Sequence, residues 1–147
     1  MKKLLLLLVM GTCNSKQEAT QGSPEQLDIQ NGFSGVQFGS SPDSIKGRLL
    51  GQTGSFATYE VEEPNRPSQV SPLVYYTYRA GRLIDIDYTV VGAHVQPYLV
   101  EMRRQYGPET TSNDTLYWRG ETVAAKGYID TEVIAEPILL ISLRKHK

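Results

Sequence analysis

The sequence predicts an α+β fold, an antiparallel sheet with two helices packed on one face. Short runs in the chain alternate apolar and polar side chains, which is the period of half-buried strands. Only two segments carry clear helix signals, so runs of strands are interrupted by isolated helices. That order is typical of an α+β fold and not of a parallel α/β sheet. The length of 147 residues fits one globular domain.

The first predicted helix covers residues 42–50. Ser41, Pro42 and Asp43 form a typical helix start. Serine can cap the helix, proline suits the first helical position, and aspartate favours the positive end of the helix dipole. Gly51 should end the helix, because glycine is common just after the last helical residue.

The second predicted helix covers residues 93–106 and is amphipathic. Its apolar residues recur at helical spacing and comprise Val95, Leu99, Met102 and Tyr106. Pro97 must then lie in the first turn, where a missing N–H is tolerated. Gly107 and Pro108 end the helix. The apolar stripe is expected to face the sheet.

The predicted strands cover residues 36–38, 57–61, 73–79, 82–91, 115–118, 121–129 and 137–143. The clearest hairpin turns at Ala80-Gly81, because glycine readily supplies a positive φ. In its second strand, Ile84, Ile86, Tyr88 and Val90 are expected to share the buried face. Residues 63–72 carry three prolines and should form a loop. A second hairpin turn is expected at Arg119-Gly120. Each half of the chain then has one helix followed by about three strands with one tight hairpin, an order compatible with duplication of one half.

The start of the chain has the layout of a secretory signal. Two lysines precede a short apolar run, and small residues follow it. The run is too short to span a bilayer, which needs about 20 apolar residues. We therefore expect residues 1–12 to form a signal peptide that is removed.

Residues 8–13 resemble the lipobox of bacterial lipoproteins, in which a diacylglycerol is attached to the cysteine after the leader is cleaved. Thr12 and Met10 depart from the residues most usual at their positions. The resemblance implies that Cys13 is lipidated and that its acyl chains hold the protein to a membrane. The alternative is a secreted protein in which Cys13 has no such role. It is the only cysteine, so it has no partner for an intramolecular disulfide.

The remaining chain divides into a tether and a domain. Residues 13–31 contain almost nothing apolar and cannot offset their ordering entropy, so we expect a flexible tether. Residues 32–147 form the predicted α+β domain. Loss of Lys2 and Lys3 with the leader changes the net charge from −1 to −3, which argues against nucleic acid as a partner. The basic end, residues 144–147, is expected to be a frayed, solvated terminus.

A second resemblance covers roughly residues 35–90. It is carried by residues 38–45, by Leu49-Leu50-Gly51 and by Tyr78 with Gly81-Arg82-Leu83. These segments resemble small bacterial envelope lipoproteins of unassigned function. More distantly they are similar to outer-membrane lipoproteins of the SmpA/OmlA type and to the β-lactamase-inhibitor-protein fold. Gly51 is followed by Gln52 here, where the SmpA/OmlA type often has proline. The resemblance implies helices against an antiparallel sheet and a role in binding other proteins.

The sequence offers little for catalysis. Only His94 and His146 could act as an imidazole base, and no Gly-x-Ser-x-Gly elbow is present. His94 is expected to be a solvated or capping residue at the start of the second helix. Two distant histidines give no zinc-ligand spacing. We therefore predict no catalytic residue, no metal and no cofactor.

The candidate binding residues are Tyr75, Asp85 and Asp87. The two aspartates lie two apart on a strand, so both carboxylates should point to one face. They could begin an oxygen-ligand cation site or simply form a solvated face. Tyr75 should lie on the same exposed face, and tyrosine combines apolar area with a polar group that suits contact surfaces. Most of the nine tyrosines are instead expected to fill the core or the strands.

These observations predict a lipid-anchored protein of the bacterial cell envelope that acts as a non-catalytic protein-binding or inhibitor-like module. Its partners would be the membrane, through the lipid, and another envelope protein. Two alternatives stay open: a small envelope hydrolase that uses carboxylates, and glycan or small-ligand binding on an aromatic sheet face. A deep cleft with converging carboxylates would favour the hydrolase. An open aromatic sheet face would favour binding.

Overall fold

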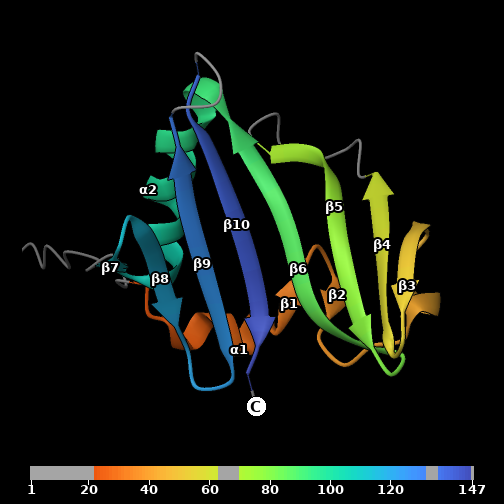
Figure 1. Ribbon diagram of the computed structural model, residues 1–147. Helices are drawn as coiled ribbons and strands as arrows, with labels where there is room; N and C mark the ends of the chain where they lie inside the picture. Colours follow the sequence, from red (N-terminus) through yellow and green to blue (C-terminus); the bar gives the residue numbers. More distant parts are fainter. Residues whose placement is uncertain (1–21, 63–69, 132–135, 147) are drawn as a thin grey trace, which may run out of the picture.

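The computed structural model describes residues 22–62, 70–131 and 136–146. Their main feature is an antiparallel sheet of eight strands in the order β3-β4-β5-β6-β10-β9-β8-β7 (Figure 1). The strands are β3 (Arg48–Thr53), β4 (Phe56–Glu62), β5 (Val70–Arg79), β6 (Arg82–Val91), β7 (Thr110–Ser112), β8 (Thr115–Arg119), β9 (Val123–Asp130) and β10 (Ile138–Lys145). A separate small ribbon pairs β1 (Gly32–Phe33) with β2 (Val36–Gln37). The predicted antiparallel sheet is confirmed.

Helix α2 (Val95–Tyr106) covers one face of this sheet and follows a short 3-10 turn, η2 (Gly92–His94). Its buried residues are Val95, Leu99, Met102 and Tyr106, the four that the helical spacing predicts. They belong to one core with the buried side chains of β5, β6, β9 and β10. Trp118 of β8 is buried in this core and donates a hydrogen bond from Nε1 to the Gly107 carbonyl oxygen over 2.9 Å.

A second short helix, α1 (Glu25–Gln30), lies where the sequence predicts a tether. Residues 22–31 therefore belong to the folded domain. Leu27 is buried in the main core, and its single apolar side chain is too weak a signal to predict a helix from sequence. The Tyr106 hydroxyl donates a hydrogen bond to the Gln30 side-chain oxygen and so joins α2 to α1. Residues 1–21, which include the predicted leader, Cys13 and the first part of the tether, lie outside the described residues.

Asp28 fixes α1 to the turn between β8 and β9. Its carboxylate accepts backbone N–H groups from Glu121, Thr122 and Val123 at 2.6–2.8 Å, and the Thr122 hydroxyl at 2.8 Å. Burial of the carboxylate opposes ionisation, but these four donors outweigh it and lower the pKa of Asp28 to about 2. Gly120 makes the approach possible, because a Cβ there would lie 2.5 Å from an Asp28 oxygen.

The predicted helix over residues 42–50 is wrong. Only a 3-10 turn, η1 (Pro42–Ser44), forms at the expected start, and the chain then continues as the edge strand β3. Pairing with β4 overrides the local signal, and Gly47 fits tightly there because a Cβ would lie 2.9 Å from the Glu60 carbonyl oxygen. Leu49 and Leu50 are exposed on this edge strand, whereas Ile45, before the strand, packs against the core. Without this helix, the two halves of the chain do not share one order of elements.

The β5–β6 hairpin forms as predicted, with its turn at Ala80-Gly81, but Ile84 does not lie on the buried face. Thr77 pairs with Asp85 and Tyr78 pairs with Leu83, so Ile84 is the extra residue of a β-bulge. Leu83 takes the buried position instead. The predicted loop at residues 63–72 is shorter, because β5 begins at Val70. Residues 63–69 lie outside the described residues.

The chain differs from prediction at two further places. Residues 110–112 form the short edge strand β7, which pairs with β8, where a loop is expected. Strand β10 continues to Lys145, so the basic end is not a frayed terminus. The His146 backbone N–H donates to the Thr122 carbonyl oxygen over 3.0 Å and fixes the end of the chain beside the β8–β9 turn.

Packing of α2 on the sheet predicts unequal effects for two neighbouring residues. Leu99→Ala removes a fully buried side chain and should lower the free energy of unfolding by about 2 to 5 kcal/mol. Val100→Ala is the matched control: Val100 is exposed, so this change should alter stability by about 0.5 kcal/mol or less. Chemical denaturation of both variants measures the difference, and a neutral Leu99→Ala would contradict the position of α2.

The Asp28 contacts predict a loss of stability in acid. The pKa of folded Asp28, about 2, lies below its ordinary value of 3.8, so its stabilising contribution is complete above pH ~4 and is lost as the pH falls through the folded value. Asp28→Asn should lower the free energy of unfolding at pH 7 by about 2 kcal/mol, because charge-assisted bonds are lost. It should also flatten the acid limb of the stability profile. Asp43→Asn, which removes an exposed carboxylate, should do neither.

Candidate functional site: the open face of the sheet

The face of the sheet away from α2 carries the candidate site, and we call it the open face. Side chains alternate along each strand, so every second residue of β4 to β10 points away from the core. No described helix packs against this face (Figure 1). Strand register aligns its side chains in rows across the sheet. One row contains Tyr75, Asp87, Ser142, Lys126 and Tyr117, and the next contains Thr77, Asp85, Arg144, Ala124 and Arg119.

Asp85 lies at the middle of the open face, where β6 meets β10. Its carboxylate accepts hydrogen bonds from Arg144 Nε at 2.9 Å and from the Ser142 hydroxyl at 3.1 Å, and Arg144 Nη2 completes a two-point ion pair. Asp85 is 6% exposed, whereas the Arg144 side chain is 63% exposed. The pair therefore buries a carboxylate and leaves part of a guanidinium accessible. The predicted solvated face is wrong for Asp85.

Asp87 points to the same face as Asp85, which confirms the predicted orientation of the two carboxylates. Burial raises the pKa of Asp87, and repulsion from Asp85 adds to the effect. Tyr75 lies directly across the β5–β6 ladder from Asp87. The structure thus brings together all three residues that the sequence predicts for binding.

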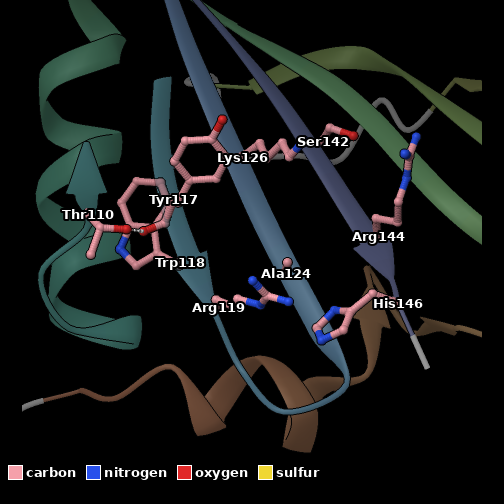
Figure 2. Close-up of a pocket in the computed structure, with 9 residues that line it drawn as sticks. All are labelled: Thr110, Tyr117, Trp118, Arg119, Ala124, Lys126, Ser142, Arg144 and His146. Carbon is pink, nitrogen blue, oxygen red and sulfur yellow. Dashed lines mark hydrogen bonds between the residues drawn. The ribbon is translucent and has the colours of Figure 1, made fainter. Parts of the chain in front are cut away.

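A hollow of about 500 Å³ lies over β8, β9 and β10, and we call it the basic hollow. The side chains that define it are Tyr117, Arg119, Lys126, Arg144 and His146, with Ala124 among them. Figure 2 shows Arg119 and His146 directed toward one another beside the small side chain of Ala124. Lys126 Nζ lies 5.6 Å from the centroid of the Tyr117 ring, which is within reach of a cation–π contact.

A second hollow of about 400 Å³ adjoins the first, and we call it the aromatic hollow. It is lined by Tyr75, Asp87, Thr89, Tyr128 and Leu140, and it shares Lys126 and Ser142 with the basic hollow. Tyr128 and Leu140 are each 46% exposed and lie directly opposite each other on β9 and β10. The two side chains therefore form one accessible apolar area with polar neighbours around it.

The sequence patterns did not reveal the basic side chains that line the basic hollow: Arg119, Lys126, Arg144 and His146. Arg119 and Lys126 come from the β8–β9 hairpin and Arg144 comes from β10, and the strand register brings these three together. His146 directly follows β10. The alternation of β8 and β9 could have placed Arg119 and Lys126 on one face with Tyr117. Arg144 and His146 are not predicted as site residues, because the basic end of the chain is expected to be a frayed terminus.

Within the part of the chain that the structure describes, no group of three or more histidine, cysteine, aspartate or glutamate side chains could hold a metal ion. His94 precedes α2 and makes no capping hydrogen bond through its side chain. Among the described helices, none is long and apolar enough to cross a membrane. No protein-family model, curated protein or solved structure matches this chain.

The two aspartates should affect stability in opposite directions. The pKa of folded Asp87 is raised above its ordinary value of 3.8, so the wild type loses stability as the pH rises through the folded value. Asp87→Asn should then raise the free energy of unfolding at pH 7, by roughly 0.5 kcal/mol. The gain should vanish below pH ~3.8, where Asp87 is protonated in both states.

Asp85→Asn provides the contrast, because it breaks the ion pair with Arg144 and should lower the free energy of unfolding by about 1 kcal/mol. Urea denaturation of the three proteins between pH 3 and pH 8 compares these effects. A destabilising Asp87→Asn at pH 7 would contradict the position given to Asp87.

Proposed function

We propose that this chain is a lipid-anchored protein of the bacterial cell envelope whose domain binds another protein through the open face and catalyses no reaction. The observation that carries the proposal is the pair of adjoining hollows on a sheet face that no described helix covers. A sheet with one face solvated is common in antiparallel folds. A solvated face with accessible Leu and Tyr, a buried carboxylate and the cationic side chains of Arg119, Lys126 and Arg144 in one area is better explained by contact with a partner.

The carboxylates support binding more than hydrolysis. A glycoside hydrolase needs two carboxyl groups that flank the scissile bond from opposite sides. Asp85 and Asp87 instead lie side by side on one strand. Both oxygens of Asp85 accept hydrogen bonds, from Ser142 and from Arg144, so this carboxylate is held as part of the surface.

The side chains of the aromatic hollow support a protein partner more than a glycan. Leu140 lies between Thr89 and Tyr128 across the ladder and offers an aliphatic surface without polar groups. An apolar side chain of a partner that covers this surface would stabilise the complex by about 25 cal/mol per Å² of apolar area removed from water. The proposed membrane location depends on the lipobox resemblance at Cys13.

Site-specific photo-crosslinking in the native host tests the proposal. A benzophenone amino acid replaces Tyr128, an exposed residue that lines the aromatic hollow. We expect a discrete adduct with a second protein in the membrane fraction. The same amino acid at Ile29, which is 73% exposed on α1, should give no such adduct.

Cys13→Ser should remove the protein from the membrane fraction or leave it as an uncleaved precursor.

An equal adduct from both positions, or none from Tyr128, would contradict binding through the open face. A protein that stays in the membrane fraction after Cys13→Ser would contradict the lipid anchor alone.

A further inference from the structure

We propose that the open face recognises an extended protein segment with an acidic side chain for the basic hollow and a large apolar side chain, about four residues away, for the aromatic hollow. This inference rests on the proposed function and adds the chemistry of the partner. The two hollows share Lys126 and Ser142, so one continuous segment can occupy both.

The charge of the basic hollow favours a carboxylate. None of the residues that line it is acidic, although the whole chain has a net charge of −1. Of its two arginines and one lysine, Arg144 is paired with Asp85, while Arg119 and Lys126 make no side-chain ion pair with any described residue. An incoming carboxylate would supply the partner that Arg119 and Lys126 lack. Arginine can bind it through two N–H groups at once.

The shape of the basic hollow also suits a carboxylate. Ala124 lies between Arg144 and Arg119 in the cross-strand row, and its methyl group leaves space where a longer side chain would stand. Arg119 and His146 border this space (Figure 2). The ring of Tyr117 closes the side next to Lys126. An acidic side chain entering here would meet cationic groups on both flanks.

The aromatic hollow provides the second contact and sets the spacing. Tyr75, Tyr128 and Leu140 surround an area that can bury an apolar or aromatic side chain. Ala124 and Tyr128 are four residues apart on β9, which corresponds to about 13 Å along a strand. An extended segment covers this distance in about four residues. Asp87 lines the aromatic hollow and repels an acidic side chain there. The acidic residue of the segment is therefore directed to the basic hollow and its apolar residue to the aromatic hollow.

Selection from a displayed library of random 12-residue peptides tests this inference. The target is the full-length chain, synthesised in a cell-free system without membranes so that Cys13, its single cysteine, stays unmodified and can carry biotin for immobilisation. We expect enrichment of peptides with Asp or Glu about four positions from Phe, Tyr, Trp or Leu. Binding of these peptides should weaken at least tenfold for Arg119→Glu combined with Lys126→Glu, and it should fall as NaCl is raised. Arg48→Glu is the matched control, because Arg48 lies on the distant edge strand β3, and it should not change binding.

The outcomes separate this inference from the proposed function. If the enriched peptides lack acidic residues but bind the Leu140→Ala variant more weakly, the open face remains a binding surface. That result would overturn the proposal that the bound segment is acidic. Peptides that bind equally well to the charge-reversed and Leu140→Ala variants, or no enrichment, would overturn both proposals. All three substitutions are at exposed side chains, and circular dichroism checks that the variants fold.

An anionic membrane is the competing occupant of the basic hollow. Vesicles of phosphatidylglycerol and phosphatidylcholine are added to the unmodified full-length chain and to the charge-reversed variant. We expect equal association of both proteins with these vesicles. Association that disappears with Arg119→Glu and Lys126→Glu, together with no acidic enrichment among the peptides, would assign the basic hollow to lipid headgroups and overturn the inference.

Discussion

Packing of α2 against one face of an eight-stranded antiparallel sheet is the constraint on which the rest of the structure depends. Leu99 and Met102 of α2 pack against the inward-facing side chains of the strands. Because side chains alternate along a strand, the choice of these inward residues also decides which residues lie on the open face. A slip of one residue would exchange the two faces. The β-bulge at Ile84 is the adjustment that keeps Leu83 and Ile86 in the core while Asp85 and Asp87 stay on the open face. The open face is thus a direct consequence of the core.

The Asp28 carboxylate also determines the geometry of the basic hollow, through the turn between β8 and β9. It holds the backbone of residues 121–123, and the Thr122 carbonyl oxygen accepts the N–H of His146. Arg119 ends β8 immediately before this turn. The contact between α1 and the turn therefore positions Arg119 and His146 of the basic hollow from the core side of the sheet.

The sequence could predict the strands with strong alternation and the amphipathic α2, because both patterns are local. It also placed Tyr75, Asp85 and Asp87 on one face, since period-two spacing needs no knowledge of the partner strands. It could not predict β3, where pairing with β4 overrides a good helix start at Ser41 to Asp43. Nor could it predict the basic hollow, because Arg119, Lys126 and Arg144 meet only through the register of β8, β9 and β10.

The central claim is that the open face is covered by a partner in the cell. Oxidative side-chain footprinting compares the protein in native membranes with the purified full-length chain. Tyr128 and Leu140 should be oxidised several-fold more slowly in membranes, while Ile29 and Val100, which are exposed on the helices, should be oxidised at equal rates in both samples. Equal oxidation of Tyr128 and Leu140 in the two samples, or slower oxidation of all four residues alike, would contradict the claim.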